Sequence, residues 1–254
     1  RDRLRSRGLG DVYKRQEGMT AEDIADKLVT LGVLKAKSEF LNLCKTGESF
    51  KESYPFVANI PVNSAQARDY ALEGYLFPDT YEIYSDESAE SIIGRMLTRF
   101  GQIMGDEYTA RAAKLNMSVD DVITLASLIE KEARHENDFT RVSAVFHLRL
   151  DKGMKLQSDA PLKYIFHTSG VLTFTAEQMA DTSLYNTHVY EGLPLGPIAN
   201  PGRKAIEAAL YPDKEYMNEG YLYFCLMDSE TGELIYAKTL EEHNANVAKY
   251  RPNW

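Results

Sequence analysis

The segment from Val119 to Ala133, VDDVITLASLIEKEA, most constrains the fold because its apolar residues recur at helical spacing. At about 100° per residue, one stripe of the helix collects Val119, Val122, Ile123, Ala126, Ile129 and Ala133. A helix with such a stripe is stable only when other elements cover it. Glu130 falls inside the stripe, Lys131 points away from it, and Glu132 lies at its far edge.

A carboxylate on an apolar helix face suggests one kind of chemistry. Burial raises the pKa of a carboxyl group because desolvation penalises the charged form. A carboxyl that is partly protonated near neutral pH can protonate a glycosidic oxygen, as a general acid does in glycoside cleavage. Glu130 could instead be a structural residue, bonded to a tyrosine or to a helix end. The helix pattern alone leaves both interpretations open.

Composition sets broad limits on function. The 254 residues are 44% hydrophobic and 26% charged, which is typical of a globular protein with one large domain or two small ones. A net charge of −9 and the absence of Lys/Arg-rich runs argue against a nucleic-acid partner. No apolar run approaches the ~18 residues of a membrane span. Cys44 and Cys225 form neither a disulfide framework nor a metal spacing, and Cys225 is expected in a core strand.

The first residues look foreign to the protein. The stretch RSRGLGDVYKRQ, ending at Gln16, back-translates into a transposase-type sequencing adaptor. We therefore expect residues 1–16 to be translated adaptor and leave them out of the fold prediction. The native sequence would then begin near Glu17, inside a domain, with its own N-terminus and any signal or anchor missing.

The remaining pattern predicts an α+β fold. Thr20 is expected to cap a first helix that ends at Gly32, and Ser118 with Asp121 to cap the helix that carries Glu130. Residues 72–84 predict a loop that leads into a short strand, and residues 221–238 a β-hairpin with its turn at SETG. Further helices are predicted over about 37–44, 88–104, 107–115 and 138–152, after 202, and from about 239.

Most familiar site motifs are absent. The sequence has no G-x-S-x-G, P-loop, dinucleotide fingerprint or H-E-x-x-H, so no cofactor is predicted. Glu132 and His135 form one E-x-x-H pair, which could be half of a carboxylate di-metal site. The second half is missing, so no metal is predicted and His135 is interpreted as a solvated helix residue. Three loops, LQSDA, YNTH and GLPLGPIANPG, offer groups that bond sugars, although each could be a simple connector.

The order of these segments resembles a known family. EGYLFPDTY, LASLIEKEA, LQSD, YNTH, GLPLGPIANPG and EHN look like the signature run of the membrane-anchored endolytic murein transglycosylases, from about Glu17 to Tyr250. The resemblance implies a small LysM-like subdomain, here truncated to residues 17–59, and an α+β catalytic domain over residues 60–254. It implies cleavage of MurNAc–GlcNAc bonds in nascent peptidoglycan strands, which leaves 1,6-anhydro-MurNAc ends.

The same resemblance implies a location and partners. It places the catalytic domain outside the cytoplasm, on a single membrane helix at the N-terminus that this chain lacks. Peptidoglycan glycan strands are the expected substrate, and peptidoglycan synthases are candidate partners. No cofactor and no nucleic acid are expected.

The resemblance also assigns site residues. The catalytic glutamate is the first Glu of the EKE unit, which is Glu130. It would protonate the leaving GlcNAc oxygen and then accept the proton of the MurNAc C6 hydroxyl, which attacks within the same sugar. An internal nucleophile has a large effective molarity, so no second carboxylate is required, and none is evident beside Glu130 in the sequence. The expected substrate-binding residues are Glu73, Gln157, Ser158, Asp159, Tyr185, Asn186, Thr187 and Asn200.

Several roles within this set stay open. Asp159 is the best candidate for a second acid, and Glu73 could lie near the site or simply tie down its loop. His188 and Leu195 depart from the usual tyrosine and proline of the family. A hydrolase would need a second carboxylate about 5–9 Å from Glu130 and would leave reducing ends. A non-catalytic glycan-binding scaffold would keep its function after Glu130→Gln.

Overall fold

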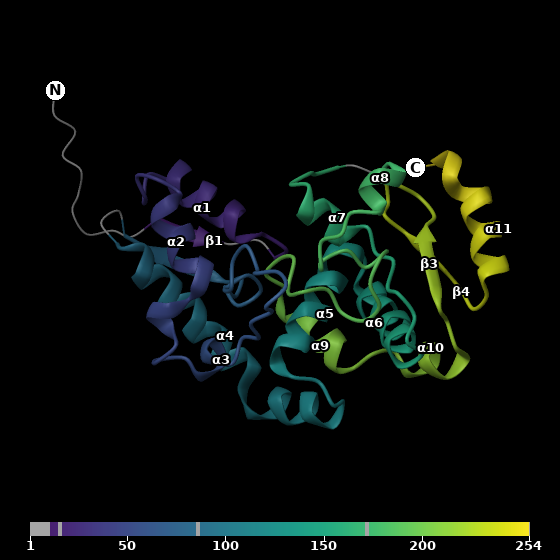
Figure 1. Cartoon of the computed structure of the whole chain (residues 1–254), viewed down its shortest axis with the longest axis horizontal. Coiled ribbons are helices and arrows are strands. Elements are labelled where there is room, and N and C mark those ends of the chain that lie inside the picture. The colour runs from purple at the N-terminus through teal and green to yellow at the C-terminus, as the bar shows by residue number, and fades with distance from the viewer. Residues whose placement is uncertain (1–10, 15–16, 85–86, 171–172, 254) are drawn as a thin grey trace.

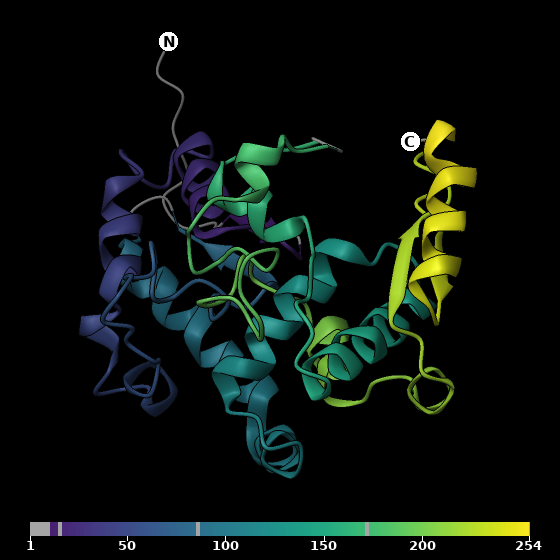
Figure 2. The same cartoon turned by 45° about the vertical axis from the view of Figure 1, so that its right-hand side comes forward.

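The computed structural model describes residues 11–14, 17–84, 87–170 and 173–253. It confirms the α+β class: helices dominate, and the described strands form two separate antiparallel pairs. Figure 1 shows α1, α2 and α4 at one end, α5, α6 and α9 in the middle, and β3, β4 and α11 at the other end. The turned view in Figure 2 keeps this order. The middle helices therefore connect the two ends of the molecule.

Of the N-terminal helices, the first has the predicted caps. These helices are α1 (Ala21–Thr30), α2 (Ser38–Thr46), the 3-10 turn η1 (Glu48–Phe50) and α3 (Pro55–Ala58). The Thr20 side chain accepts from Asp23 N, and the Asp23 carboxylate accepts from Thr20 N, which completes a capping box. Gly32 follows with a φ of 72°, the left-handed conformation that ends helices.

One strand falls inside the stretch that was left out of the fold prediction. β1 (Asp11–Lys14) pairs antiparallel with β2 (Thr80–Ile83), with Asp11 opposite Ile83. The fold prediction therefore missed one strand of this sheet. Residues 1–10 and 15–16 lie outside the described residues, and the adaptor origin of residues 1–16 stays a prediction.

The middle of the molecule is a helical layer. Its helices are α4 (Ala89–Lys114), α5 (Val119–Glu132), α6 (Glu136–Asp151) and α9 (Arg203–Leu210). α4 is interrupted at Gly105, whose φ of 32° and ψ of 179° are not helical, so the predicted separate helix from Glu107 is confirmed. α5 packs against both α6 and α9. Ser118 and Asp121 form the predicted capping box at its start.

α5 is buried on all sides, not only along the predicted stripe. Every residue from Val122 to Ile129 is buried, including Thr124 and Leu128 on the face opposite that stripe. The buried polar groups are satisfied, because Ser127 Oγ donates to Thr124 O and accepts from Ile198 N. α5 is therefore the core helix, and Glu130 is half-buried because the helix reaches the surface in its last turn.

The C-terminal end confirms the predicted hairpin. β3 (Tyr223–Leu226) pairs antiparallel with β4 (Leu234–Ala237), and α11 (Leu240–Tyr250) and the 3-10 turn η2 (Arg251–Asn253) follow. Cys225 is buried and free, as is Cys44. Short helices that the sequence pattern did not predict are α7 (Ala160–Ile165), α8 (Ala176–Met179) and α10 (Lys214–Glu219).

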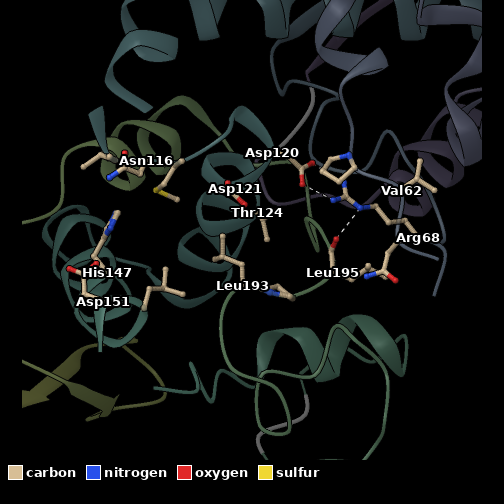
Figure 3. Close-up of a pocket in the computed structure, with 16 residues that line it drawn as sticks. Val62, Arg68, Asn116, Asp120, Asp121, Thr124, His147, Asp151, Leu193 and Leu195 are labelled. Atoms are coloured by element: carbon tan, nitrogen blue, oxygen red, sulfur yellow. Dashed lines mark hydrogen bonds and ion pairs between the residues drawn. The ribbon is translucent and has the colours of Figure 1, made fainter. Parts of the chain in front are cut away.

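A buried ion pair holds the start of α5. Arg68 donates to both oxygens of Asp120, from Nη1 at 2.8 Å and from Nη2 at 2.6 Å, and Tyr75 OH donates to the same carboxylate at 2.7 Å. Figure 3 shows Arg68 and Asp120 of this group at the edge of a hollow. Asp120 also lies in the first turn of α5, where the helix dipole favours a negative charge.

Over the four ranges that the structure describes, no helix combines the length and the apolar character that crossing a bilayer requires.

Gly74 allows the backbone to lie close to the Pro197 ring and the Ile123 side chain. Its φ is +90°, and a Cβ there would lie 2.5 Å from Pro197 Cβ and 2.8 Å from Ile123 Cγ2. We expect Gly74→Ala to lower the free energy of unfolding by about 3 kcal/mol in urea titration. Gly153 has a φ of +65° and no atom within 4 Å of a built Cβ, so Gly153→Ala should cost only about 1 kcal/mol. Equal losses would contradict the steric explanation.

Candidate active site

Glu130 lies in the last turn of α5, where the buried helix reaches the surface. Its Oε2 accepts a hydrogen bond of 2.9 Å from the backbone N–H of Gly202. Gly202 is the N-cap of α9, so its N–H belongs to the positive end of that helix. The two helix ends therefore meet at this carboxyl group.

The surroundings raise the pKa of Glu130 from its ordinary value of 4.5 to about 7. Burial is the main cause, and the Gly202 hydrogen bond opposes it by favouring the ionised form. The negative charge of Glu17 raises the pKa further, whereas Lys131 and Lys204 lower it. Near neutral pH the protonated and ionised forms of Glu130 are therefore both populated, as a group that donates and then accepts a proton requires.

Glu17 is a carboxylate neighbour that sequence reasoning missed. A Cβ built on Gly202 would lie 2.0 Å from Glu17 Oε1, and the N–H of the same glycine binds Glu130. Two carboxyl groups thus flank one backbone glycine. No carboxylate partner was evident beside Glu130 in the sequence, and the structure supplies one, because folding brings Glu17, just before α1, against the end of α5. No spacing in the sequence signals this contact.

The two predicted loops LQSDA and YNTH lie together beside the end of α5. Gln157 N donates to Thr187 O at 3.1 Å, and Thr187 Oγ1 bonds both the N–H and the C=O of Ser158 at 3.1 Å each. Ser158 Oγ in turn donates to Glu132 Oε1. The helix that carries Glu130 is therefore bonded directly to these loops.

Glu132 is a second residue that the site prediction omitted. Burial raises its pKa, while the Ser158 hydrogen bond lowers it and the charge of Asp159 raises it. The helical pattern placed this residue only at the edge of the stripe. Its position in the last turn of the helix gave no sign of this bond, since Ser158 follows α6 and is distant along the chain. Here it anchors the Ser158 loop.

Glu73 and Asn200 form a buried polar network. Glu73 is 1% exposed and accepts from Ala21 N at 3.1 Å and from Asn200 Nδ2 at 2.6 Å. Asn200 is fully buried, accepts from Leu76 N at 2.9 Å and donates to Met19 O at 3.0 Å. These bonds tie three loops together. Two roles were left open for Glu73. The observed bonds describe the one in which it holds its loop in place, and its contact with a glycan stays a prediction.

The YNTH side chains are likewise buried. Asn186 donates to Met179 O and to Asp181 O and accepts from His188 N, so its amide is fully used. Tyr185 is 2% exposed, and its ring lies 5.1 Å from that of Tyr164. The sugar contacts predicted for these side chains, and for buried Ser158 and Thr187, remain untested.

Gln157 and Asp159 keep exposed atoms. Gln157 is exposed with a φ of 51°, and its Oε1 accepts from Arg149 Nη1 at 3.3 Å. The Asp159 side chain is 48% exposed and forms an ion pair with His188 Nε2 at 2.9 Å. Of the eight residues predicted to bind substrate, these two are placed to contact a ligand without rearrangement.

A hollow of about 630 Å³ opens at the other end of α5. Asp120, Thr124, His147 and Leu193 are among its lining residues (Figure 3). It starts at the first turn of α5, whereas Glu130 lies in the last turn. This hollow therefore does not contain the predicted acid.

Within the described part of the chain, no three His, Cys, Asp or Glu side chains are grouped so that they could hold a metal ion. His135 is exposed at the N-cap of α6, and its Nε2 lies 3.0 Å from Thr231 O.

The half-buried carboxyl of Glu130, beside polar loops on an α+β fold, is the candidate acid–base group. The sequence model of the YceG-like family matches residues 9–249. The chain belongs to the YceG-like family, which confirms the resemblance inferred from the sequence motifs.

Similar proteins carry a functional name. The chain is 40% identical over 184 residues to the endolytic murein transglycosylase of Bacillus subtilis strain 168, a match that covers 71% of this chain and 48% of the relative. It is 36% identical over 202 residues to the endolytic murein transglycosylase of Streptococcus pneumoniae strain D39, with coverages of 78% and 35%. The chain thus spans about half or less of these relatives.

A solved structure matches the fold. The crystal structure of a YceG-like protein from Listeria monocytogenes superimposes with a TM-score of 0.80 at 34% identity. The match covers 94% of this chain and 76% of that one.

The raised pKa of Glu130 predicts a pH-dependent stability. The folded protein holds this proton more tightly than the unfolded chain, so the stabilisation is complete below pH 4.5 and is lost as pH rises through about 7. Compared with the wild type, Glu130→Gln should therefore gain on the order of 2 kcal/mol above pH 7 and nothing near pH 4. Urea unfolding across this range measures the gain. Glu136→Gln, at an exposed site, is the control, and a pH-independent gain would contradict the expectation.

Asn200→Ala tests the buried network. It leaves Leu76 N–H, Met19 C=O and the Glu73 carboxylate without this partner, so we expect a loss of roughly 3 kcal/mol in unfolding free energy. Asn137→Ala, at an exposed position, should change it by less than about 0.5 kcal/mol. Unchanged stability with weaker glycan binding would assign Asn200 to the substrate instead.

Proposed function

We propose that this chain is the catalytic part of an endolytic peptidoglycan transglycosylase. It cleaves MurNAc–GlcNAc bonds within nascent glycan strands and leaves 1,6-anhydro-MurNAc ends. The observation that carries the proposal is the half-buried carboxyl of Glu130, with a pKa of about 7, at the exposed end of the core helix. The printed names of the Bacillus and Streptococcus relatives support the same activity.

The first step uses the protonated form of Glu130. The carboxyl donates its proton to the O4 atom of the leaving GlcNAc while the bond from that oxygen to MurNAc C1 breaks. Gly202 N–H holds Oε2, and among the described residues no hydrogen bond to Oε1 is found. Oε1 is therefore the oxygen that remains for the glycan. The Gly202 hydrogen bond then stabilises the carboxylate that forms.

The second step uses the ionised form. The Glu130 carboxylate accepts the proton of the MurNAc C6 hydroxyl as O6 bonds to C1 of the same sugar. One C–O bond is broken and one is formed, the proton moves from O6 to O4, and no water is consumed. The attack is intramolecular, so its effective molarity replaces an activated water.

The rest of the assignment is part of the same proposal. Residues 17–59 act as the remainder of a LysM-like subdomain, and residues 60–254 act as the catalytic domain. The enzyme works outside the cytoplasm from a membrane anchor, on peptidoglycan strands that synthases supply. No cofactor, metal or nucleic acid takes part.

Hydrolysis is the alternative that a specific observation favours. Glu17 shares Gly202 with Glu130, so it supplies the second carboxylate that a hydrolase needs to activate water. The products separate the two reactions, because hydrolysis leaves reducing ends.

Glu130→Gln tests the acid. It keeps the shape of the side chain but removes the transferable proton, so the rate on purified peptidoglycan should fall at least roughly 100-fold. Mass spectrometry of the products should show anhydro ends for the wild type and for the exposed control Glu136→Gln. A scaffold protein would retain its function in Glu130→Gln, and reducing ends from the wild type would support hydrolysis.

Glu17→Gln tests whether Glu17 only raises the pKa of Glu130 or activates a water molecule for hydrolysis. Removing a like charge lowers the pKa of Glu130, so activity should be lost at a lower pH than in the wild type while anhydro ends persist. The pH dependence of kcat/KM measures this shift. Complete loss of activity in Glu17→Gln would instead indicate that Glu17 activates water.

A further inference from the structure

A second hollow, of about 250 Å³, lies between the start of α1, the end of α5 and α7. Its charged lining residues are Glu22, Asp23, Glu73, Lys131, Lys163 and His167. Figure 2 shows α1, in purple, and the segment that contains α7, in green, both in the upper part of the view. The lysines among these residues could hold an anionic group of a ligand.

The acidic groups of this hollow already have protein partners. Glu22 accepts from Tyr70 OH at 2.9 Å and lies 3.5 Å from His167 Nδ1. Asp23 is used in the capping box of α1, and Glu73 binds Ala21 N and Asn200. These carboxylates are therefore not free to hold a cationic ligand.

The two lysines differ from the acids. Among the described residues, neither Lys131 nor Lys163 lies within 4 Å of a carboxylate. Lys131 Nζ donates to Gly18 O at 3.2 Å, and Lys163 is near enough to Glu132 to lower its pKa. The three carboxylates outnumber the two lysines, but they are bonded within the protein, so the ammonium groups are the charged groups that keep donors for a ligand, which favours a carboxylate or another anion.

The hollow adjoins the candidate acid. A Cβ built on Gly18 would lie 3.4 Å from Glu130 Cγ and 3.9 Å from Lys131 Cδ, so this glycine separates the acid from the hollow. Ala160, two residues after Ser158, lines it from the loop side. A ligand in the hollow is thus held within reach of a sugar at Glu130.

We propose that this hollow binds the peptide stem of the MurNAc residue that is cleaved, through a stem carboxylate held by Lys131 and Lys163. The inference rests on the proposed function. The stem is attached through the lactyl group on C3 of MurNAc, in the same ring as the scissile C1 atom, so its binding site must adjoin the acid. The hollow is smaller than the ~300 Å³ of typical drug-sized sites, which suits a short peptide segment and not a glycan strand.

Binding to the inactive Glu130→Gln protein tests this inference without turnover. The probes are synthetic glycan tetramers with a free-carboxylate stem, with a stem whose carboxylates are amidated, and without a stem. We expect the carboxylate stem to tighten Kd about tenfold over the other two, the effect of one charge-assisted contact. Adding Lys163→Gln should remove this advantage, Lys163→Arg should keep it, and exposed Lys152→Gln should leave it unchanged.

A phosphate source is tested in the same assay. A polyglycerol phosphate oligomer should not displace the stem-bearing tetramer, and displacement at equal concentration would assign the hollow to phosphates. Equal affinity for all three tetramers, or an advantage that survives Lys163→Gln, would overturn the proposal. Failure of the proposed function has a separate readout, since the wild type would then produce no anhydro ends from either stem-bearing or stem-free strands.

Discussion

The structure depends on the complete burial of one helix that ends at the surface. α5 is covered on every side from Val122 to Ile129, and its last turn carries Glu130 into a half-buried position. There the N–H of Gly202, at the start of α9, holds one carboxyl oxygen at 2.9 Å. Burial raises the pKa, and this N–H limits the rise, because one penalises the charge and the other stabilises it. The balance between the two gives a value near neutrality.

The buried polar groups near Glu130 hold the surrounding chain segments in place. Asn200 joins Leu76, Met19 and Glu73, so the loop before β2, the segment before α1 and the loop before α9 are held by one side chain. This network fixes Gly18 and Glu17 against the end of α5. Buried polar networks of this kind define one arrangement, since each unpaired group would cost free energy. The rigid surroundings of the candidate acid follow from these bonds.

The loops beside α5 show how a scaffold and a binding surface are divided. The polar side-chain atoms of Ser158 and Thr187 are used in bonds between these two residues and in the bond to Glu132. Gln157 and Asp159, by contrast, keep exposed atoms. A similar division holds for the hollow at the start of α1, where the carboxylates are bonded internally and, among the described residues, neither lysine forms an ion pair. In both places the residues that are bonded within the protein position those that remain available to a ligand.

The sequence by itself determined what depends on neighbouring residues. Caps such as Thr20 with Asp23 and Ser118 with Asp121 define helix starts through contacts three residues apart, and apolar periodicity identified α5 and the hairpin. Glu130 was found from the same periodicity and from the family motif. The tertiary structure alone decided which distant groups meet that residue. Glu17, Gly202 and Lys204 reach Glu130 only when the chain folds, and Asn200 and Glu73 became buried ties. Desolvation and charge act through space, so no local spacing encodes them.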